Sequence, residues 1–220
     1  MSLVDYERII RSLKRISPSD KTCMDEFGYT LPTIYNMREQ YVSWSKNKHF
    51  HREEKGVYGD VANGYFNDSG NFVPYTMPAI IYSNGDKEWY KNGICHRDDL
   101  DKNGRVLPAV ICHDGSQYWY KNGIICRDDL DEKGRVLPAR IFSNGDKHWF
   151  KNGYLHRDDL DENGRVLPAI CNSDGSQSWH KNGLLHRDDR DENGKVLPAI
   201  IYSEGDHAWY NNGNFTNVRI

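Results

Sequence analysis

Three copies of the tripeptide His-Arg-Asp, each with an Asn five residues after the Asp, are the strongest chemical motif of the chain. The copies are His96-Arg97-Asp98 with Asn103, His156-Arg157-Asp158 with Asn163, and His186-Arg187-Asp188 with Asn193. The pattern matches the catalytic loop of protein kinases, in which the Asp acts as the base. A catalytic loop would not occur three times, and no glycine-rich loop with a following V-A-I-K and no D-F-G accompanies it. We therefore expect these residues to be structural and the chain to have no enzymatic activity.

The acidic segment after each motif has the D-x-[DN]-x-[DN]-G pattern of calcium loops. Its candidate calcium ligands are Asp99, Asp101, Asn103, Asp159, Asp161, Asn163, Asp189, Asp191 and Asn193. The acidic ligand that an EF-hand needs at position 12 is replaced by Val110, Ile170 and Ile200. One hypothesis is a calcium-stabilised structural rod. The hypothesis that we favour is an Asp-capped turn that ends in a glycine with positive φ, without a metal cofactor.

Two further positions recur through the chain and suggest a zinc ladder or an anion site. The first position holds His96, Cys126, His156 and His186, and the second holds Arg97, Arg127, Arg157 and Arg187. With two strands per repeat, equivalent atoms lie ~10 Å apart, whereas zinc ligands lie ~2.0–2.3 Å from the metal. We therefore predict no zinc site. Each Arg precedes two Asp, which favours a ladder of charges over a site for an anionic ligand.

The tryptophans are the best candidates for binding. They are Trp89, Trp119, Trp149, Trp179 and Trp209. An exposed row of aromatic rings can bind a protein or a sugar. The alternative is that the rings stack and hold one repeat to the next.

All these residues belong to a tandem repeat of 30 residues. Its phase is marked by Pro78, Pro108, Pro138, Pro168 and Pro198. We divide the chain into five repeats at 77–220, a degenerate repeat at 31–76 that contains an insertion from residue 55, and a helical cap at 1–20. Apolar residues near helical spacing predict the cap, and its alternative is a helix that binds a partner.

Asn-Gly pairs predict the hairpins of each repeat. Asn84-Gly85 and Asn92-Gly93 favour type I′ turns, and Asn103-Gly104 lies in an acidic segment that we expect to protrude as a loop. A two-residue turn at 84–85 would pair Ile81 with Glu88 and Ile80 with Trp89.

This register predicts which residues share a face of the sheet. One face carries Ala79, Ile81 and Tyr90, is more uniformly apolar across the repeats than the other face, and is predicted to be the interior. The opposite face carries Ile80, Tyr82 and Trp89, and it admits the polar residues Arg140 and Asn172. We therefore expect the Trp face to be partly exposed.

Composition limits the classes of function. The net charge of −3 gives no basic footprint for nucleic acid, and no apolar stretch is long enough to cross a membrane. The five Cys do not share a repeat position, and the N-terminal residues carry charges instead of an apolar signal sequence. These features predict an intracellular protein that binds neither nucleic acid nor membranes.

The units W-Y-K-N-G, H-R-D-D and L-P-A-I resemble variant MORN repeats over about residues 77–213, with the degenerate copy from residue 31. The resemblance implies an all-β, elongated, single-layer solenoid of antiparallel hairpins without catalytic residues. Such repeats occur in bacterial antitoxin-like proteins and in giant-virus and phage proteins. This chain departs from them in its longer repeat.

The resemblance and the residues together predict a non-enzymatic scaffold for protein–protein interaction. Its expected setting is a large-DNA-virus protein in the host cytoplasm or the virion. The expected partner is another protein or a second copy of the chain. An antitoxin-like binding module and the calcium-stabilised rod are the alternatives.

Overall fold

The computed structural model describes residues 32, 34–36, 41–46, 49–50, 52, 55 and 64–219. These residues form strands, turns and loops, and no helix occurs among them, so none of them belongs to a helix that could cross a membrane. The helix predicted within residues 1–20 lies outside the described residues. The chain divides into two compact units, which we call the N-terminal unit (to Gly115, with Tyr120–Gly123) and the C-terminal unit (Ser116–Trp119 and from Ile124 onward).

The N-terminal unit is built on an antiparallel sheet. Its strand order is β1 (Ile34–Asn36), β2 (Tyr41–Ser43), β7 (Ile80–Tyr82), β8 (Lys87–Glu88) and β11 (Val110–Ile111). Short hairpins accompany it: β3 (Ser45–Lys46) with β4 (His49–Phe50), β5 (Gly64–Phe66) with β6 (Phe72–Pro74), and β9 (Tyr90–Lys91) with β10 (Ile94–Cys95). Strand β13 (Tyr120–Lys121) also belongs to this unit.

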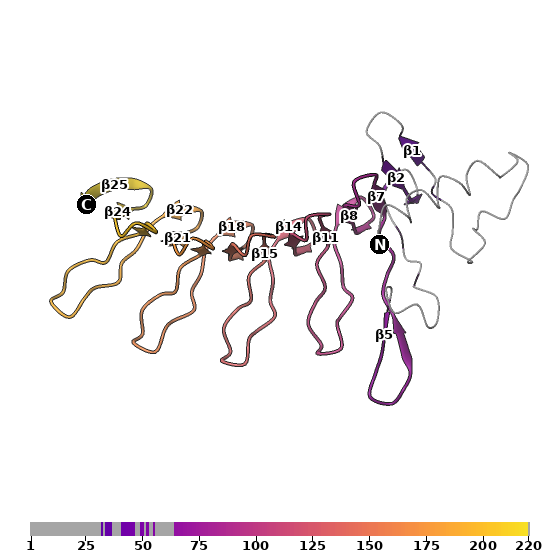
Figure 1. Ribbon diagram of the computed structural model, residues 1–220, viewed down its shortest axis with the longest axis horizontal. Coiled ribbons are helices and arrows are strands. Elements are labelled where there is room, and N and C mark those ends of the chain that lie inside the picture. Colours follow the sequence, from indigo (N-terminus) through magenta and orange to yellow (C-terminus); the bar gives the residue numbers. More distant parts are fainter. Residues whose placement is uncertain are drawn as a thin grey trace, which may run out of the picture. The chain divides into compact units, whose positions relative to one another are not determined.

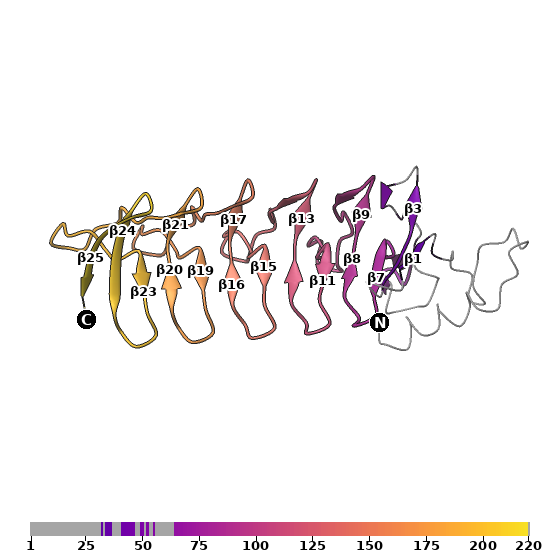
Figure 2. The same ribbon diagram turned by 90° about the horizontal axis from the view of Figure 1, so that it is seen from above.

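The C-terminal unit repeats the same plan. Its antiparallel sheet has the order β12 (Gln117–Tyr118), β15 (Arg140–Ile141), β16 (Lys147–His148), β19 (Ile170–Cys171), β20 (Gln177–Ser178), β23 (Ile200–Ile201), β24 (His207–Asn211) and β25 (Asn214–Arg219). Its other strands are β14 (Ile124–Ile125), β17 (Phe150–Lys151) with β18 (Tyr154–Leu155), and β21 (His180–Lys181) with β22 (Leu184–Leu185). The hairpins of β17 and β21 continue from β16 and β20 (Figure 2).

The first turn of each repeat differs from the prediction. Ile80 lies opposite Glu88, and the backbone N–H of Tyr82 donates to Asp86 O at 2.9 Å, so the loop has three residues, 83–85. Only Gly85 of these has a positive φ, of 99°. This is the turn that ends in a left-handed glycine and a bulge, and the predicted two-residue turn at Asn84-Gly85 is wrong.

The second turn is confirmed as type I′. Asn92 and Gly93 have φ values of 52° and 80°, and Lys91 pairs directly with Ile94 across them. A type I′ turn needs positive φ at both central residues, which Asn and Gly tolerate best.

The changed register moves Trp89 onto the predicted interior face and Tyr90 onto the opposite one, while Ala79 and Ile81 stay interior and are buried as predicted. The indoles of Trp89, Trp119, Trp149 and Trp179 are only 4–7% exposed, so the prediction of a partly exposed Trp face is wrong. The opposite face carries the positions of Ile80, Glu88 and Tyr90. A slip of one residue has this effect because side chains alternate along a strand.

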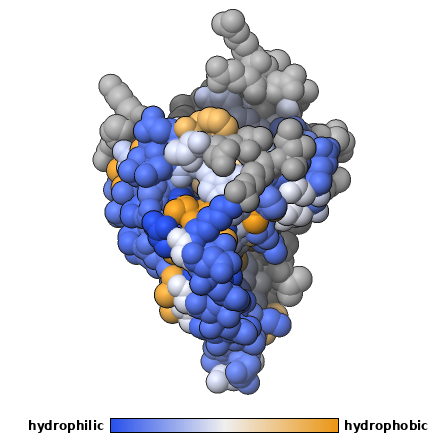
Figure 3. All heavy atoms as spheres, turned by 90° about the vertical axis from the view of Figure 1, so that its left-hand side faces the viewer, coloured by the Kyte–Doolittle hydropathy of each residue, from blue (hydrophilic) through white to orange (hydrophobic). Residues whose placement is uncertain are grey.

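The acidic segments project as loops. In the C-terminal unit the loop of residues 158–166 is closed by a bridge between Leu160 and Val166 and by the N–H of Asp161, which donates to Arg165 O at 2.8 Å. The loops of this unit extend to one side of its sheet (Figure 1). When the unit is viewed from its C-terminal end, the side on which these loops project is predominantly hydrophilic (Figure 3).

Strand β25 caps the sheet of the C-terminal unit. It runs back along β24 and places Val218 opposite Ala208. This is the relation that Val110 of one repeat has to Glu88 of the repeat before it. The last strand therefore takes the position that a following repeat would occupy.

Candidate functional site

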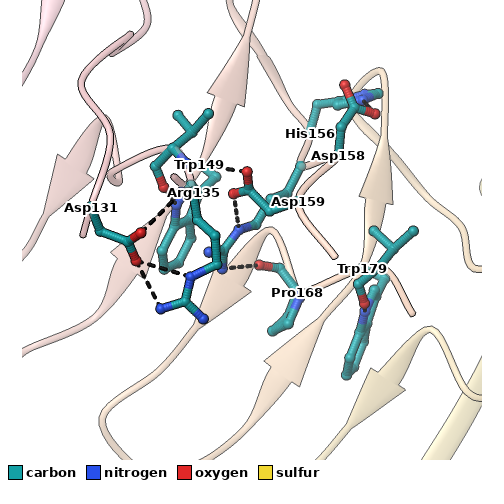
Figure 4. Close-up of polar contacts among 11 residues, drawn as sticks. Asp131, Arg135, Trp149, His156, Asp158, Asp159, Pro168 and Trp179 are labelled. Atoms are coloured by element: carbon teal, nitrogen blue, oxygen red, sulfur yellow. Dashed lines mark hydrogen bonds and ion pairs between the residues drawn. The ribbon is translucent and has the colours of Figure 1, made fainter. Parts of the chain in front are cut away.

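The Trp face is filled by a cluster that we call the arginine staple, defined by Trp149, Arg157, Asp159 and Pro168 in the C-terminal unit (Figure 4). The guanidinium of Arg157 lies 3.9 Å above the indole centroid of Trp149. Its Nε donates to Asp159 Oδ2 at 2.9 Å and its Nη1 donates to Pro168 O at 3.3 Å. The same Arg-on-Trp contact recurs for Arg52 on Trp44, Arg97 on Trp89, Arg127 on Trp119 and Arg187 on Trp179.

Each staple also holds the loop of the preceding repeat. Trp149 Nε1 donates to Val136 O at 2.8 Å, and Val136 N donates to Asp159 Oδ1 at 3.1 Å. The peptide groups of Thr76 and Val166 are held in the same way. The predicted charge ladder therefore connects successive repeats, and the indole N–H and the guanidinium are both engaged within the protein.

The His-Arg-Asp motif is likewise engaged in contacts between repeats. His156 Nδ1 accepts a hydrogen bond from the backbone N–H of Asn182 at 3.0 Å, so its Nε2 carries the proton and donates to Asp158 Oδ1 at 2.7 Å. Lys151 pairs with the same carboxylate. The imidazole therefore fixes the next Asn-Gly turn, and its acceptor nitrogen is occupied.

The predicted calcium ligands have two separate roles. Asp159 binds Arg157 on the sheet side, whereas Asp161 Oδ1 accepts the backbone N–H groups of Asn163 at 2.8 Å and Arg165 at 2.9 Å. The same division holds for Asp99 and Asp101, with Asn103, and for Asp189 and Asp191, with Asn193. Among residues 64–219 and the described residues before them, no group of three or more His, Cys, Asp or Glu could hold a metal. The favoured turn without a metal and the alternative of calcium binding both stay untested predictions.

The loop that departs from the calcium pattern has its own ion pair. In it the carboxylate of Asp131 accepts hydrogen bonds from Nε and Nη2 of Arg135 at 2.9 and 2.8 Å (Figure 4). This fork is the main reason that the pKa of Asp131 is lowered to about 2. Lys133, which stands where the other loops have Asn, donates its backbone N–H to the same carboxylate.

The face opposite the tryptophans carries half-buried aromatic rings, and we call it the aromatic face. In the C-terminal unit Tyr118, Phe142 and Phe150 surround Arg140, with ring centroids 5.0, 5.7 and 5.4 Å from its Cζ. All three rings retain part of their surface in solvent. His148 completes the group, with its ring 5.0 Å from that of Phe142.

Arg140 differs from the staple arginines in its bonding. Within the part of the chain that the structure describes, its side chain has ring contacts but no hydrogen bond and no ion pair, and its Nε is buried without a partner. In the sequence, Arg140 had indicated only that its face of the sheet is exposed. What sets Arg140 apart in the sequence is its position in the repeat, at which the other repeats carry only apolar residues. These are Ile80, Val110, Ile170 and Ile200.

A column of exposed apolar side chains follows the Asn-Gly turns of the C-terminal unit. Ile124, Tyr154 and Leu184 are 48%, 61% and 50% exposed. Each contacts the glycine of the next turn, as Tyr154 does at Gly183. This column was not predicted from the sequence, although the residue after each Asn-Gly pair is Ile, Tyr or Leu in these repeats.

Two of the cavities lined by described residues lie on the Trp side. One, of 260 Å³ in the N-terminal unit, is lined by residues that include Trp89, His96 and Arg97. The other, of 150 Å³ in the C-terminal unit, is lined by residues that include His156, Trp179 and Arg187. Both are bounded by staple and His-Asp pairs, whose polar atoms already bond to one another.

Comparison with known proteins gives no further assignment. The chain matches no known family model and no curated protein sequence. Its resemblance to MORN repeats therefore stays a prediction.

Proposed function

We propose that this chain is a non-enzymatic repeat scaffold that binds another protein through its aromatic face. The observation that carries this proposal is the group of half-buried rings around Arg140. Tyr, Phe and Arg are enriched at the centres of protein interfaces, where they combine large apolar area with polar groups.

The division of labour between the two faces supports this proposal. The Trp face holds the repeats together, since Trp149, Arg157 and Asp159 bond to one another and to the backbone of neighbouring repeats. The aromatic face varies more from repeat to repeat, as at the position of Glu88, Tyr118 and His148. A constant structural face with a variable opposite face is typical of repeat proteins that bind partners.

The repeats themselves supply a conservative test. In the variant Y118S/F142N/F150H each aromatic residue is replaced by the residue that another repeat carries at the same position, as in Ser178, Asn172 and His180. We expect this variant to fold and to lose partner capture in an affinity pull-down from cells that express the tagged chain.

The control is Tyr154→Asn on the exposed column, which copies Asn214. Capture that is lost in the triple variant and kept in Y154N supports the proposed face. Capture that is equal in both variants, or lost only in Y154N, rejects it. Sedimentation of the purified chain tests whether the partner is a second copy.

The finer description that we propose is a MORN-like solenoid that acts inside the cell, as a large-DNA-virus component or an antitoxin-like binding module. Its support is the repeated Trp-Tyr-Lys-Asn-Gly element, together with the antiparallel hairpins that the described residues form. Co-purification of the chain with viral particles or with a toxin would decide between the two settings.

A further inference from the structure

We infer that Arg140 is a receptor for a carboxylate, and that the aromatic face of the C-terminal unit recognises an acidic side chain flanked by apolar residues on a protein partner. This inference rests on the proposed function and specifies the chemistry of the partner.

The first argument is the unused bonding capacity of Arg140. A guanidinium has five N–H donors, and its planar fork matches the two oxygens of a carboxylate. Arg140 donates to no group among the described residues, and its Nε is already shielded from water. Nη1 and Nη2 are not among the buried atoms without a partner, so they are the donors that an arriving oxyanion would reach.

The second argument is the contrast with Arg157 in the same unit. Arg157 stacks on one ring and has a carboxylate and a carbonyl as acceptors. Arg140 lies near three rings and has neither. The repeat does not need an arginine at this position, because Ile170 and Ile200 occupy it in the next two repeats.

The third argument is the charge around the site. Burial, and then the neighbouring Arg140, lower the pKa of His148, and burial lowers the pKa of His180, so both imidazoles are neutral at pH 7. Asp146, the other charged group near His148, binds the backbone N–H of Ser173. The face therefore offers one positive charge, which matches a singly charged carboxylate better than a doubly charged phosphate.

The rings define what flanks the carboxylate. Tyr118, Phe142 and Phe150 offer apolar surface within about one side-chain length of the guanidinium. Apolar neighbours of the acidic residue would cover these rings and exclude water, which strengthens the ion pair. The expected motif is an Asp or Glu between aromatic or aliphatic residues.

The experiment is a selection of random dodecapeptides displayed on phage against the full chain. We expect the recovered peptides to share an Asp or Glu next to apolar residues. Affinity should fall roughly 30-fold or more when Arg140 is changed to Ile, or when the peptide acid is changed to its amide, because either change leaves one charge of a buried pair alone. Arg140→Lys keeps the positive charge but loses the planar pair of donors. Its affinity for the peptide should therefore lie between that of the wild-type chain and that of R140I.

Folding is controlled within the same series. Arg140→Ile installs the residue of the following repeats, so it should melt at or above the temperature of the wild-type chain. A lower melting temperature would show that Arg140 is needed for the fold and would overturn the inference.

The remaining outcomes separate the inference from the proposed function. Peptides that lack an acid, or that bind R140I as well as the wild type, overturn the carboxylate receptor and leave the scaffold standing. The carboxylate receptor is also overturned if inorganic phosphate releases the bound peptides from the chain at a lower concentration than acetate does. If no peptide is recovered whose binding is lost in Y118S/F142N/F150H, both proposals fail.

Discussion

Arginine has two roles in this chain, and the difference lies in its acceptors. Arg157 lies over an indole and donates to a carboxylate and to a carbonyl of the chain. Arg140 lies among rings with its donors unused by the described residues. The first arrangement stabilises the fold, and the second is costly unless another molecule completes it.

Arg157→Met should destabilise the chain strongly. The side chains of Arg157 and Asp159 are 9% and 11% exposed, so the change leaves a nearly buried carboxylate without its counter-ion. Loss of one partner of a buried pair costs about 3–5 kcal/mol. Urea unfolding followed by tryptophan fluorescence measures the change in the free energy of unfolding.

The matched control for that variant is Lys151→Met. Lys151 and its partner Asp158 are 59% and 63% exposed, and an exposed pair contributes at most about 1 kcal/mol. Equal losses for R157M and K151M would show that the staple does not hold the repeats together.

His148 and His180 should make the chain less stable in mild acid. Burial lowers the pKa of both imidazoles, with Arg140 adding to the effect at His148 and Asp146 opposing it. A base whose folded pKa is lowered binds fewer protons in the folded state than in the unfolded state. Its contribution to stability is therefore complete above the unfolded pKa of about 6.5 and is lost as the pH falls below it.

The measurement is the free energy of unfolding at pH 7.5 and at pH 5.5. The variant H148Y/H180Y carries the residues that other repeats have at the equivalent positions, Tyr118 and Tyr90. It should lose less stability between pH 7.5 and pH 5.5 than the wild-type chain. An equal loss in both proteins would assign the acid sensitivity to other groups.

At the scale of the hairpin, glycines determine the turns in two ways. Gly183 has a φ of 86°, and a Cβ there would lie 3.3 Å from Tyr154 Cδ1. Gly194 has a φ of 77°, with nothing within 4 Å of its Cβ position. Gly194 therefore reports backbone strain alone, and Gly183 reports strain together with a contact between repeats.

Gly194→Ala should cost about 1 kcal/mol and Gly183→Ala should cost more. Both place a side chain in the left-handed region, and only the second also presses on Tyr154. Thermal melts of the two variants in one buffer give the difference. A larger effect at Gly194 would contradict the packing of each turn against the column residue before it.

The acidic loops should be insensitive to calcium. Asp161 already accepts two backbone N–H groups, and Asp159 is paired with Arg157, so a metal would have to displace bonds that the loop makes within the protein. We expect the same melting temperature in EDTA and in millimolar calcium. A ligand at 100 times its dissociation constant would stabilise the fold by about 2.7 kcal/mol, so a clear upward shift would revive the calcium-stabilised rod.

At the scale of the whole chain, the repeat is the unit of construction. Trp149 Nε1 binds Val136 O, and Trp179 Nε1 binds Val166 O in the next repeat. Equivalent contacts in successive repeats mean that a repeat can be removed without leaving its neighbours unmatched.

Deletion of residues 138–167 should give a folded chain. It joins Leu137 to Pro168, the same dipeptide as at Leu167-Pro168, and brings Val136 to Trp179 in place of Val166. Circular dichroism should keep its β signal, and unfolding should stay cooperative. Deletion of residues 138–152 removes half a repeat, so it breaks the 30-residue phase and should abolish both the β signal and the cooperative unfolding. Equal behaviour of the two deletions would show that the contacts between repeats do not depend on this phase.

Sequence alone determined the repeat, its hairpins and the type I′ turn at Asn92-Gly93, because these follow from periodicity and from local backbone preference. It also marked the acidic segment as a loop. It did not determine whether Trp89 or Tyr90 shares the buried face of Ala79 and Ile81, since that depends on whether the turn at Gly85 has two or three residues. Side chains alternate with a period of two, so one extra residue in that loop moves every side chain of the second strand to the other face.

Tertiary structure also decided what each charge does. Arg157 and Arg140 are the same residue type in one repeat, and sequence cannot assign their acceptors. Asp159 and Pro168 reach Arg157 because the loop folds back onto the Trp face, while Arg140 points to the opposite face, where aromatic rings surround it. Hydrogen bonds of this kind join residues brought together by the sheet, so only the arrangement of strands showed which arginine has acceptors within the described residues and which has none.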